Sequence, residues 1–447
     1  MVWRRAFAKY ALLFILTALF FGFPESYLIK TRLAGQYYRC EAVLLVILVL
    51  FLIYYVIWKR RHRTSFSTLE IFTVLLLALP LCSAVMAWVT FDQPLYLGIL
   101  TERRWGMILI GLVMYYLLSI EYIDIKVLSR IFLITAITVI CVGILTEINL
   151  FNLLAFGFMS TRRFSNVTVA FIIIYCLILF KKQRNWFAMC VALAFSAYPF
   201  FTLKGRGFII GLALTVVVVM VVNKNRKAMW RNVILTGLFF ILVLSGFRLA
   251  SPGKFAFVVK DMSYVLTVVQ GETSGDVDTD ARMAEVRKVV AHIKKSPFNR
   301  LFFGSGNLSR HFGKKNNRGI IPKKKQSFRG IFGYFYPVDI GFVGMIFVYG
   351  LLGFGFVNLV FLFGLKYKTD EKFVEHEVFL STLRYYLVFI FLMSMQKGMV
   401  FMQPEIAVVP VFILWYASAE RIAFEDEDES NRSWFNKFVN RMLIGRV

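Results

Sequence analysis

Residues 41–58 read EAVLLVILVLFLIYYVIW, and the basic run KRRHR follows directly at 59–63. A helix needs about 20 mainly apolar residues to cross the hydrocarbon core of a bilayer. An apolar run of nearly this length that is closed by several positive charges is typical of a membrane span that ends at the cytoplasmic surface. The stretch therefore predicts a transmembrane helix.

The whole chain has the same character. Hydrophobic residues make up 59% of its 447 residues and charged residues only 17%, whereas a soluble protein carries about 25% charged residues. These values exclude a soluble enzyme of ordinary composition, a nucleic-acid-binding domain and a disordered chain. The net charge of +26 then favours anionic membrane lipid, or an anionic substrate at a membrane, as the partner in place of nucleic acid.

Apolar runs of similar length recur along the chain. They cover residues 6–23, 41–58, 70–91, 105–120, 127–147, 166–180, 186–203, 207–223, 232–247, 338–364, 383–400 and 402–418. We therefore predict an all-α polytopic integral membrane protein with about twelve transmembrane helices. Basic clusters in alternate short loops predict that these loops and both termini are cytoplasmic.

One segment interrupts this pattern. Helices one to nine take up residues 1–247, helices ten to twelve take up 338–418, and 419–447 form a cytoplasmic tail. Residues 248–337 between them form an outer loop with 17 Lys and Arg against 6 Asp and Glu, a net charge of +11. A connection of this length is uncommon without a function, so the basic loop is the first functional clue.

The loop contains a predicted helix at 279–295. Met283, Val286, Val290 and Ile293 recur at helical spacing and form one apolar stripe, and Pro297 follows the end of the helix. Another face carries Arg282 and Glu285, which are neighbours on a helix. A surface salt bridge is the simpler interpretation of Glu285.

Two further groups of charges lie where a membrane makes them costly. The turn Lys204-Gly205-Arg206-Gly207 joins two predicted spans at the outer surface. It is either a snorkelling anchor or an anion site, because an arginine fork suits diphosphate oxygens. Asp339 opens the tenth predicted span. The helix dipole alone favours a carboxylate there, and the same carboxylate could also orient an acceptor sugar or accept its proton.

These motifs, in this order, resemble the superfamily of O-antigen polymerases and O-antigen ligases, bacterial envelope glycosyltransferases. The matching stretches are Thr202 to Gly207, then Asp280-Ala281-Arg282 with Pro297 and Gly304-Ser305-Gly306 downstream, and then Asp339 to Gly344. The resemblance covers roughly residues 160–360; the first half of the chain matches in hydropathy alone. It implies a GT-C-like membrane fold in the bacterial inner membrane with a periplasmic active face.

The resemblance also implies a reaction. The substrate is a glycan linked through diphosphate to undecaprenol, and the enzyme transfers it to an acceptor hydroxyl with inversion, without a metal ion or other cofactor. Arg206, Arg282 and Lys204 are expected to bind the donor diphosphate, whose negative charge grows as it leaves. Asp339, with Glu285 as second choice, is the expected catalytic residue, and the expected acceptor or glycan contacts are Tyr334, Tyr336 and Arg329.

One departure from the family pattern decides between its branches. The ligase branch places a His about nine residues before the acidic residue of the last motif, whereas this chain has Gly330 there and no His between 312 and 375. We therefore expect a polymerase of O-antigen, capsule or exopolysaccharide repeat units that works beside a chain-length regulator and a flippase. The alternatives are an O-antigen ligase that transfers glycan to lipid A–core, and a transporter or flippase without covalent chemistry.

Overall fold

The computed structural model describes most of the chain. The described residues are 2–21, 34–61, 66–147, 166–202, 206–221, 226–250, 277–308, 340–366, 369–398 and 403–418, with residues 252, 253, 255, 256, 259 and 400 in addition. The C-terminal tail, most of the basic loop outside 277–308 and the turn at 203–205 lie outside this part of the chain.

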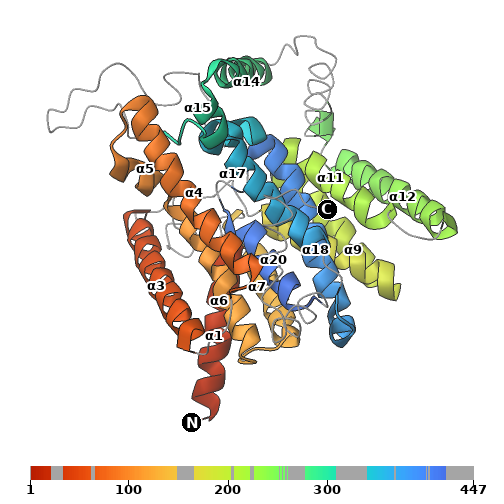
Figure 1. The fold of residues 1–447 in the computed structure, drawn as a ribbon. Helices are drawn as coiled ribbons and strands as arrows, with labels where there is room; N and C mark the ends of the chain where they lie inside the picture. The colour runs from red at the N-terminus through yellow and green to blue at the C-terminus, as the bar shows by residue number, and fades with distance from the viewer. Residues whose placement is uncertain are drawn as a thin grey trace, which may run out of the picture.

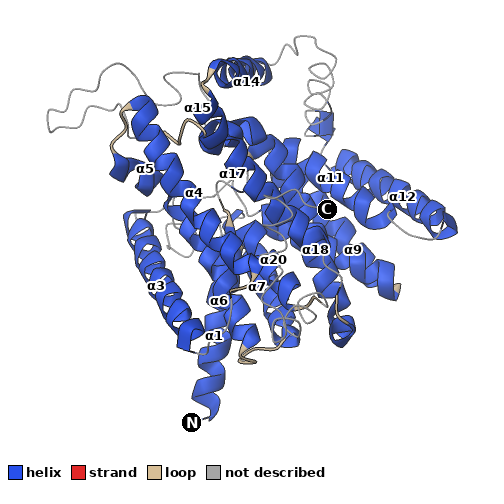
Figure 2. Cartoon of the chain, viewed as in Figure 1, coloured by secondary structure: helices blue, strands red, loops and turns tan. Residues whose placement is uncertain are grey.

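Every regular element in the described part is a helix, which confirms the all-α class; Figure 2 shows no strand there. The first half contains α1 (Val2–Phe20), α3 (Ala34–Arg61), α4 (Thr68–Phe91), α5 (Leu95–Glu102), the 3-10 helix η1 (Arg103–Ile108), α6 (Leu109–Ser119), α7 (Ile125–Glu147), α9 (Asn166–Gln183), α10 (Trp186–Thr202) and α11 (Arg206–Val221). The second half contains α12 (Arg226–Ala250), α14 (Val277–Lys295), α15 (Phe298–Phe303), α17 (Gly341–Lys366), the 3-10 helix η3 (Glu371–His376), α18 (Glu377–Lys397) and α20 (Glu405–Tyr416).

Six helical segments in the described part are long and apolar enough to cross a membrane. They are Val43–Arg61, Thr68–Phe91, Ile125–Val142, Trp230–Leu249, Gly341–Lys366 and Glu371–Met395. Shorter apolar helices occupy Lys9–Phe20, Trp186–Ser196, Phe208–Val221 and Glu405–Tyr416. A helix overlaps each of the twelve predicted apolar stretches, but twelve membrane crossings stay a prediction.

The core of the bundle is built around α20. Residues 405–415 of this helix are all buried, as expected for a helix that is apolar on every side. It packs against α6, α17 and α18, and Figure 1 shows it in the middle of the bundle. Gly111 of α6 lets that helix approach α20 closely, because its missing side chain leaves room for the buried ring of Phe412.

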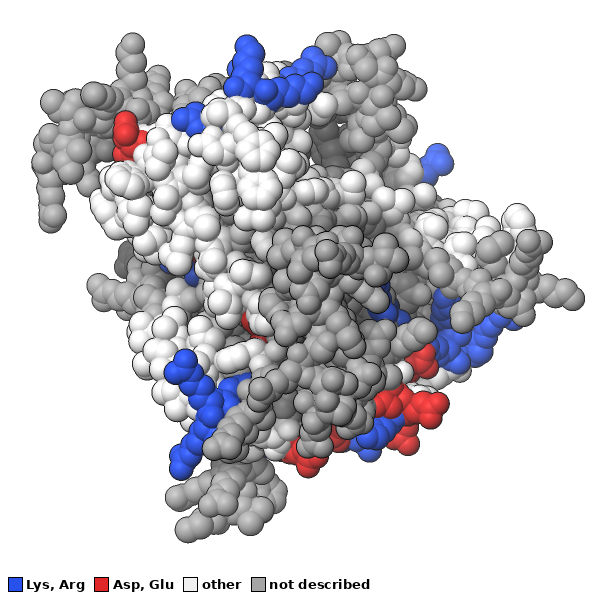
Figure 3. Space-filling model, viewed as in Figure 1, with Lys and Arg blue, Asp and Glu red and all other residues white. Residues whose placement is uncertain are grey.

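The outer helices present apolar side chains to their surroundings. Ile47 on α3 is 56% exposed and Ile241 on α12 is 59% exposed. On the face shown in Figure 3, most charged side chains lie towards the two ends of the molecule and leave a largely uncharged middle. This distribution is what a hydrocarbon environment around the helices requires.

The predicted helix of the basic loop is confirmed and slightly longer, since α14 spans Val277–Lys295 and ends before Pro297. Pro297 then precedes the short helix α15. Figure 1 shows α14 lying across one end of the bundle, at the top of the view, with α15 below it. Both helices pack against α17, and α15 also packs against α4.

The contact between α6 and α20 generates a stability prediction. A Cβ at position 111 would lie 2.7 Å from Cδ2 of Phe412 and 3.4 Å from Cα of Val409, so we expect Gly111→Ala to lower the free energy of unfolding by about 1–3 kcal/mol. Gly237→Ala on α12 is the matched control, because nothing lies within 4 Å of its Cβ position; it should be neutral or stabilise by up to about 1 kcal/mol. Thermal unfolding in detergent measures both, and equal melting temperatures would contradict this packing.

Candidate functional site

The underside of α14 is the first feature of the candidate site. Glu285 is 2% exposed and Val289 is completely buried, while the exposed Arg287 and Lys288 lie between them in the sequence. The expected surface position of Glu285 is therefore wrong, since this residue lies on the same buried face of α14 as Val289.

The predicted apolar stripe of α14 is right only in part. Val286 and Ile293 do pack against the core, but so does the completely buried Val289. With about 100° of rotation per residue, the face that contains Glu285, Val286, Val289 and Ile293 is turned by about 65° from the predicted stripe. Apolar spacing alone missed this because it gives a carboxylate no weight on a buried face.

The helical unit formed by α14 and α15 is followed by a loop, residues 304–308, that hydrogen-bonds to the bundle. We call it the docking loop. The backbone N–H of Ser305 donates to the carbonyl of Phe347 (N···O 2.7 Å), and that of Gly306 donates to the carbonyl of Val348 (3.1 Å). These carbonyls lie just before a break in α17, where Gly350 has φ 66° and ψ −172°. Carbonyls in the last turn of a helical segment lack partners inside it, and the docking loop supplies them.

Three glycines make this close approach possible. Gly304, Gly306 and Gly350 all have positive φ values, between 66° and 85°. A Cβ at Gly304 would overlap the backbone of Val348, and a Cβ at Gly350 would overlap the backbone of Phe302. The Gly304-Ser305-Gly306 stretch therefore has a structural cause, because two backbones meet here without space for side chains.

A buried carboxylate stands beside the docking loop. Glu102, at the end of α5, is 3% exposed. Its Oε2 accepts a hydrogen bond from the Tyr349 hydroxyl (2.5 Å), and its Oε1 accepts one from the Ser83 hydroxyl (3.2 Å). The Tyr349 hydroxyl in turn accepts from Nε1 of Trp105 (2.6 Å). Four elements, α4, α5, η1 and α17, thus meet at one carboxylate.

The same network reaches the docking loop through Asn307. Its backbone N–H donates to Oγ of Ser83 (3.1 Å), and its carbonyl accepts from Nε2 of Gln93 (3.1 Å). Ser83 and Gln93 are completely buried. Sequence reasoning missed this network; the available signal was the carboxylate of Glu102 between two predicted spans.

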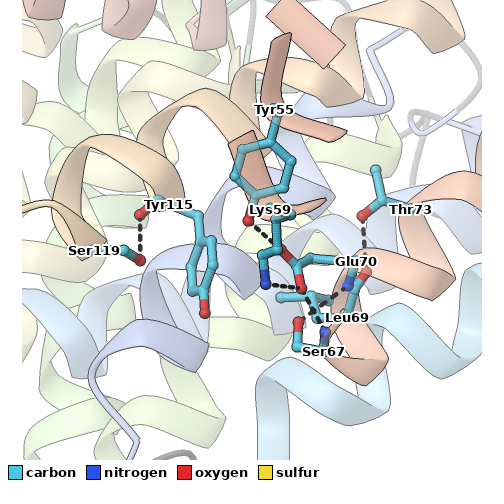
Figure 4. Close-up of polar contacts among 8 residues, drawn as sticks. All are labelled: Tyr55, Lys59, Ser67, Leu69, Glu70, Thr73, Tyr115 and Ser119. Carbon is cyan, nitrogen blue, oxygen red and sulfur yellow. Dashed lines mark hydrogen bonds and ion pairs between the residues drawn. The ribbon is translucent and has the colours of Figure 1, made fainter. Parts of the chain in front are cut away.

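A second buried ionic group lies at the opposite end of α4, where α3 and α4 meet (Figure 4). Glu70 accepts hydrogen bonds from the Tyr55 hydroxyl, from Nζ of Lys59 (3.0 Å) and from the backbone N–H of Ser67 (2.5 Å). The Ser67 hydroxyl accepts from the N–H of Glu70, which completes a capping box. The Tyr55 and Lys59 contacts join α3 to α4, and the Ser67 contacts cap the start of α4. We therefore assign this group to the fold and not to a site.

Most of the predicted site residues lie outside the described part of the chain. They are Lys204, Arg329, Tyr334, Tyr336 and Asp339. Arg206 is the first residue of α11 and Arg282 belongs to α14, but their side chains also lie outside it. Glu285 is therefore the predicted site residue whose surroundings the structure gives. No group of His, Cys, Asp and Glu in the described residues could hold a metal ion.

His292 is a titratable group on the side of α14 that packs against α17. Its ring centroid lies 5.6 Å from that of Phe347 on α17. Partial burial, and secondarily the positive charge of Arg300, lower the pKa of the His292 imidazole below its usual 6.5. The docked state therefore holds the neutral ring more readily than a detached α14 would.

Comparison with protein-family models, with curated proteins and with solved structures finds no match for the chain. The fold nevertheless defines a class, that of all-helical proteins with several helices suited to crossing a membrane. In this chain, α14 and α15 pack against one end of the bundle. An activity must be argued from the chemistry of its own residues.

The lowered pKa of His292 predicts that acid loosens α14. Because a detached α14 binds more protons than a docked one, docking is favoured above the usual pKa and weakens as pH falls towards the lowered value. Trypsin cleavage at the exposed Arg287 and Lys288 should therefore accelerate between about pH 7.5 and about pH 5.5 in the wild type relative to His292→Gln. Comparison of the two proteins at each pH removes the pH dependence of trypsin itself, and an unchanged ratio would refute the prediction.

The pair of Lys59 and Glu70 generates a second prediction. Glu70→Ala leaves a buried ammonium without its carboxylate and should cost about 3–5 kcal/mol of unfolding free energy. Glu377→Ala removes the carboxylate of the Lys182–Glu377 pair. The Glu377 side chain is 49% exposed, so this loss should cost no more than about 1 kcal/mol. Thermal unfolding of both variants tests the difference, and similar losses would show that burial does not matter here.

Proposed function

We propose that the protein is a membrane glycosyltransferase that polymerises undecaprenyl-diphosphate-linked oligosaccharide repeat units at the outer face of the bacterial inner membrane. The observation that supports this most is the burial of Glu285 in the interface between α14 and the bundle. An acidic residue of the extramembrane helix is thereby held close to the ends of apolar helices, where a lipid-linked substrate presents its headgroup.

The chemistry expected of the residues agrees with such a substrate. Arg282 lies three residues before Glu285 in α14, and residues at this spacing are neighbours on a helix. Arg206 begins α11, and Gly211 of that helix packs against Met393 of α18. These two guanidinium groups would stabilise the negative charge that develops on a lipid diphosphate leaving group. Lys204 would add a third positive charge to the donor site.

The acceptor side of the proposal rests on residues near the start of α17. Asp339 comes two residues before α17 begins at Gly341. A carboxylate there would accept the proton of the attacking hydroxyl or orient it. Tyr334, Tyr336 and Arg329 would bind the glycan by stacking and hydrogen bonding.

The proposal includes a topology. Twelve helices cross the membrane, both termini are cytoplasmic, and the basic loop at 248–337 is periplasmic. Its excess positive charge would attract anionic headgroups and anionic glycan. The partners are then the lipid-linked glycan and the flippase and chain-length regulator of the same assembly line.

Separation of surface and secreted polysaccharide on a gel, from a strain that lacks the gene and from the same strain complemented with wild-type protein, tests the reaction. Single lipid-linked repeat units, or lipid A–core capped by one repeat, are expected in the deletion strain. Full-length chains left on undecaprenyl diphosphate would identify a ligase. Repeat units trapped on the cytoplasmic side would identify a flippase, and either result would overturn the polymerase.

The donor site generates its own prediction. Arg282→Ala should reduce chain formation by about 10²- to 10³-fold, because a cation that stabilises the leaving diphosphate is lost. Arg287→Ala is the matched control, since Arg287 belongs to the same helix and is exposed. Arg282→Lys should also be poor, because a point charge replaces a bidentate fork. The measurement is polymer length and yield in the complemented strain at equal membrane levels of protein, and near-normal chains from both Arg282→Ala and Arg206→Ala would remove the diphosphate site.

A further inference from the structure

We infer that Glu102 is a positioning residue, which holds α14, α15 and the docking loop in place across the end of the bundle without touching substrate. This inference rests on the proposed function only in its consequence for transfer. The positioning itself is a property of the fold that can be measured alone.

The docking loop lies where α4 and α17 come together. Its amides donate to the carbonyls of Phe347 and Val348 on α17. On the other side, a Cβ at Gly306 would overlap the backbone of α4 at Ser83 and Ala87. The space between α4 and α17 therefore holds the backbone of the loop but has no room for a Cβ at Gly306. A small change in the separation of the two helices would alter how the loop fits.

Glu102 fixes that separation. One carboxylate oxygen binds Tyr349 on α17 and the other binds Ser83 on α4. Tyr349 lies one residue after Val348, and Ser83 is the residue whose hydroxyl accepts from the docking loop at Asn307. The carboxylate therefore bridges the two walls of the space at the level where the loop enters. The Asn307 side chain also hydrogen-bonds to Glu102, which adds a direct contact with the loop.

The network requires a carboxylate and not merely a polar group. The Tyr349 hydroxyl already accepts from Nε1 of Trp105, and the Ser83 hydroxyl already accepts from the N–H of Asn307. Each hydroxyl must therefore direct its own proton to another acceptor, and the two oxygens of Glu102 accept both protons. A glutamine offers one oxygen and one NH2 group, so in Glu102→Gln one buried hydroxyl proton loses its acceptor.

The position of this network makes the effect local. Trp105 and Tyr349 are 1% and 2% exposed, so water does not readily replace a lost partner. The helices at the centre of the bundle, α18 and α20, supply none of the hydrogen bonds described for Glu102. A defect at Glu102 should therefore loosen the docking loop before it loosens the core.

Hydrogen exchange of the full-length protein in detergent, read by mass spectrometry, tests the positioning. In Glu102→Gln, amides of α15 and the docking loop should exchange at least about tenfold faster than in the wild type, while peptides from α18 and α20 keep their protection. Glu375→Gln, an exposed position on η3, is the matched control and should exchange as the wild type does. Tyr349→Phe removes one donor and keeps the carboxylate, so it decides the question if Glu102→Gln does not fold.

The enzymatic consequence is read separately. With lipid-linked repeat units as substrate, Glu102→Gln should lower kcat by about tenfold or more with little change in KM, because the loop unit is misplaced while the membrane part of the donor site is intact. Wild-type protection of the docking loop in both variants would overturn the inference, and so would equal loss of protection in α18. Normal kcat with a loosened loop would overturn its consequence for transfer. If the wild type itself transfers no glycan while the exchange pattern holds, the proposed function fails and the positioning role stands.

Discussion

Buried backbone groups need hydrogen-bond partners, and this requirement governs the end of the bundle where α17 breaks. The break at Gly350 frees carbonyls on a helix that is otherwise suited to crossing a membrane. Ser305 and Gly306 satisfy two of them, and they do so at a distance that excludes side chains. These two bonds, together with the hydrogen bonds around Glu102, fix where the docking loop meets α17 and hence where α14 and α15 lie.

The placement of α14 in turn decides which of its residues face the bundle. Glu285 and Val289 lie in the interface, and His292 sits against Phe347. Glu285 is thus kept out of bulk water, and under the proposed function this is where the lipid-linked substrate would present its headgroup.

Hydropathy was enough to predict the all-α class and the approximate position of each long apolar helix, because apolar runs near membrane thickness have few other uses. The extent of α14 was also predictable, from its helical spacing and from Pro297 just beyond its end. The orientation of α14 was not, since a buried Glu285 contradicts the rule that carboxylates face water. The Glu102 network escaped prediction because its members, such as Ser83 and Tyr349, are far apart in the sequence and carry no local pattern.

The distance along the chain between these members also bears on how the protein is made. Trp105 and Tyr349 are 244 residues apart, and Ser83 and Asn307 are 224 apart. At a synthesis rate of about 10 residues per second, Asn307 and Tyr349 are synthesised roughly 20 to 25 seconds after the residues of α4 and η1 to which they hydrogen-bond. During that time the Glu102 carboxylate lacks the hydrogen bonds that Tyr349 and Asn307 donate to it in the folded protein. Assembly of the N-terminal half is therefore completed only after α17 emerges, which makes the nascent chain dependent on its own late segments.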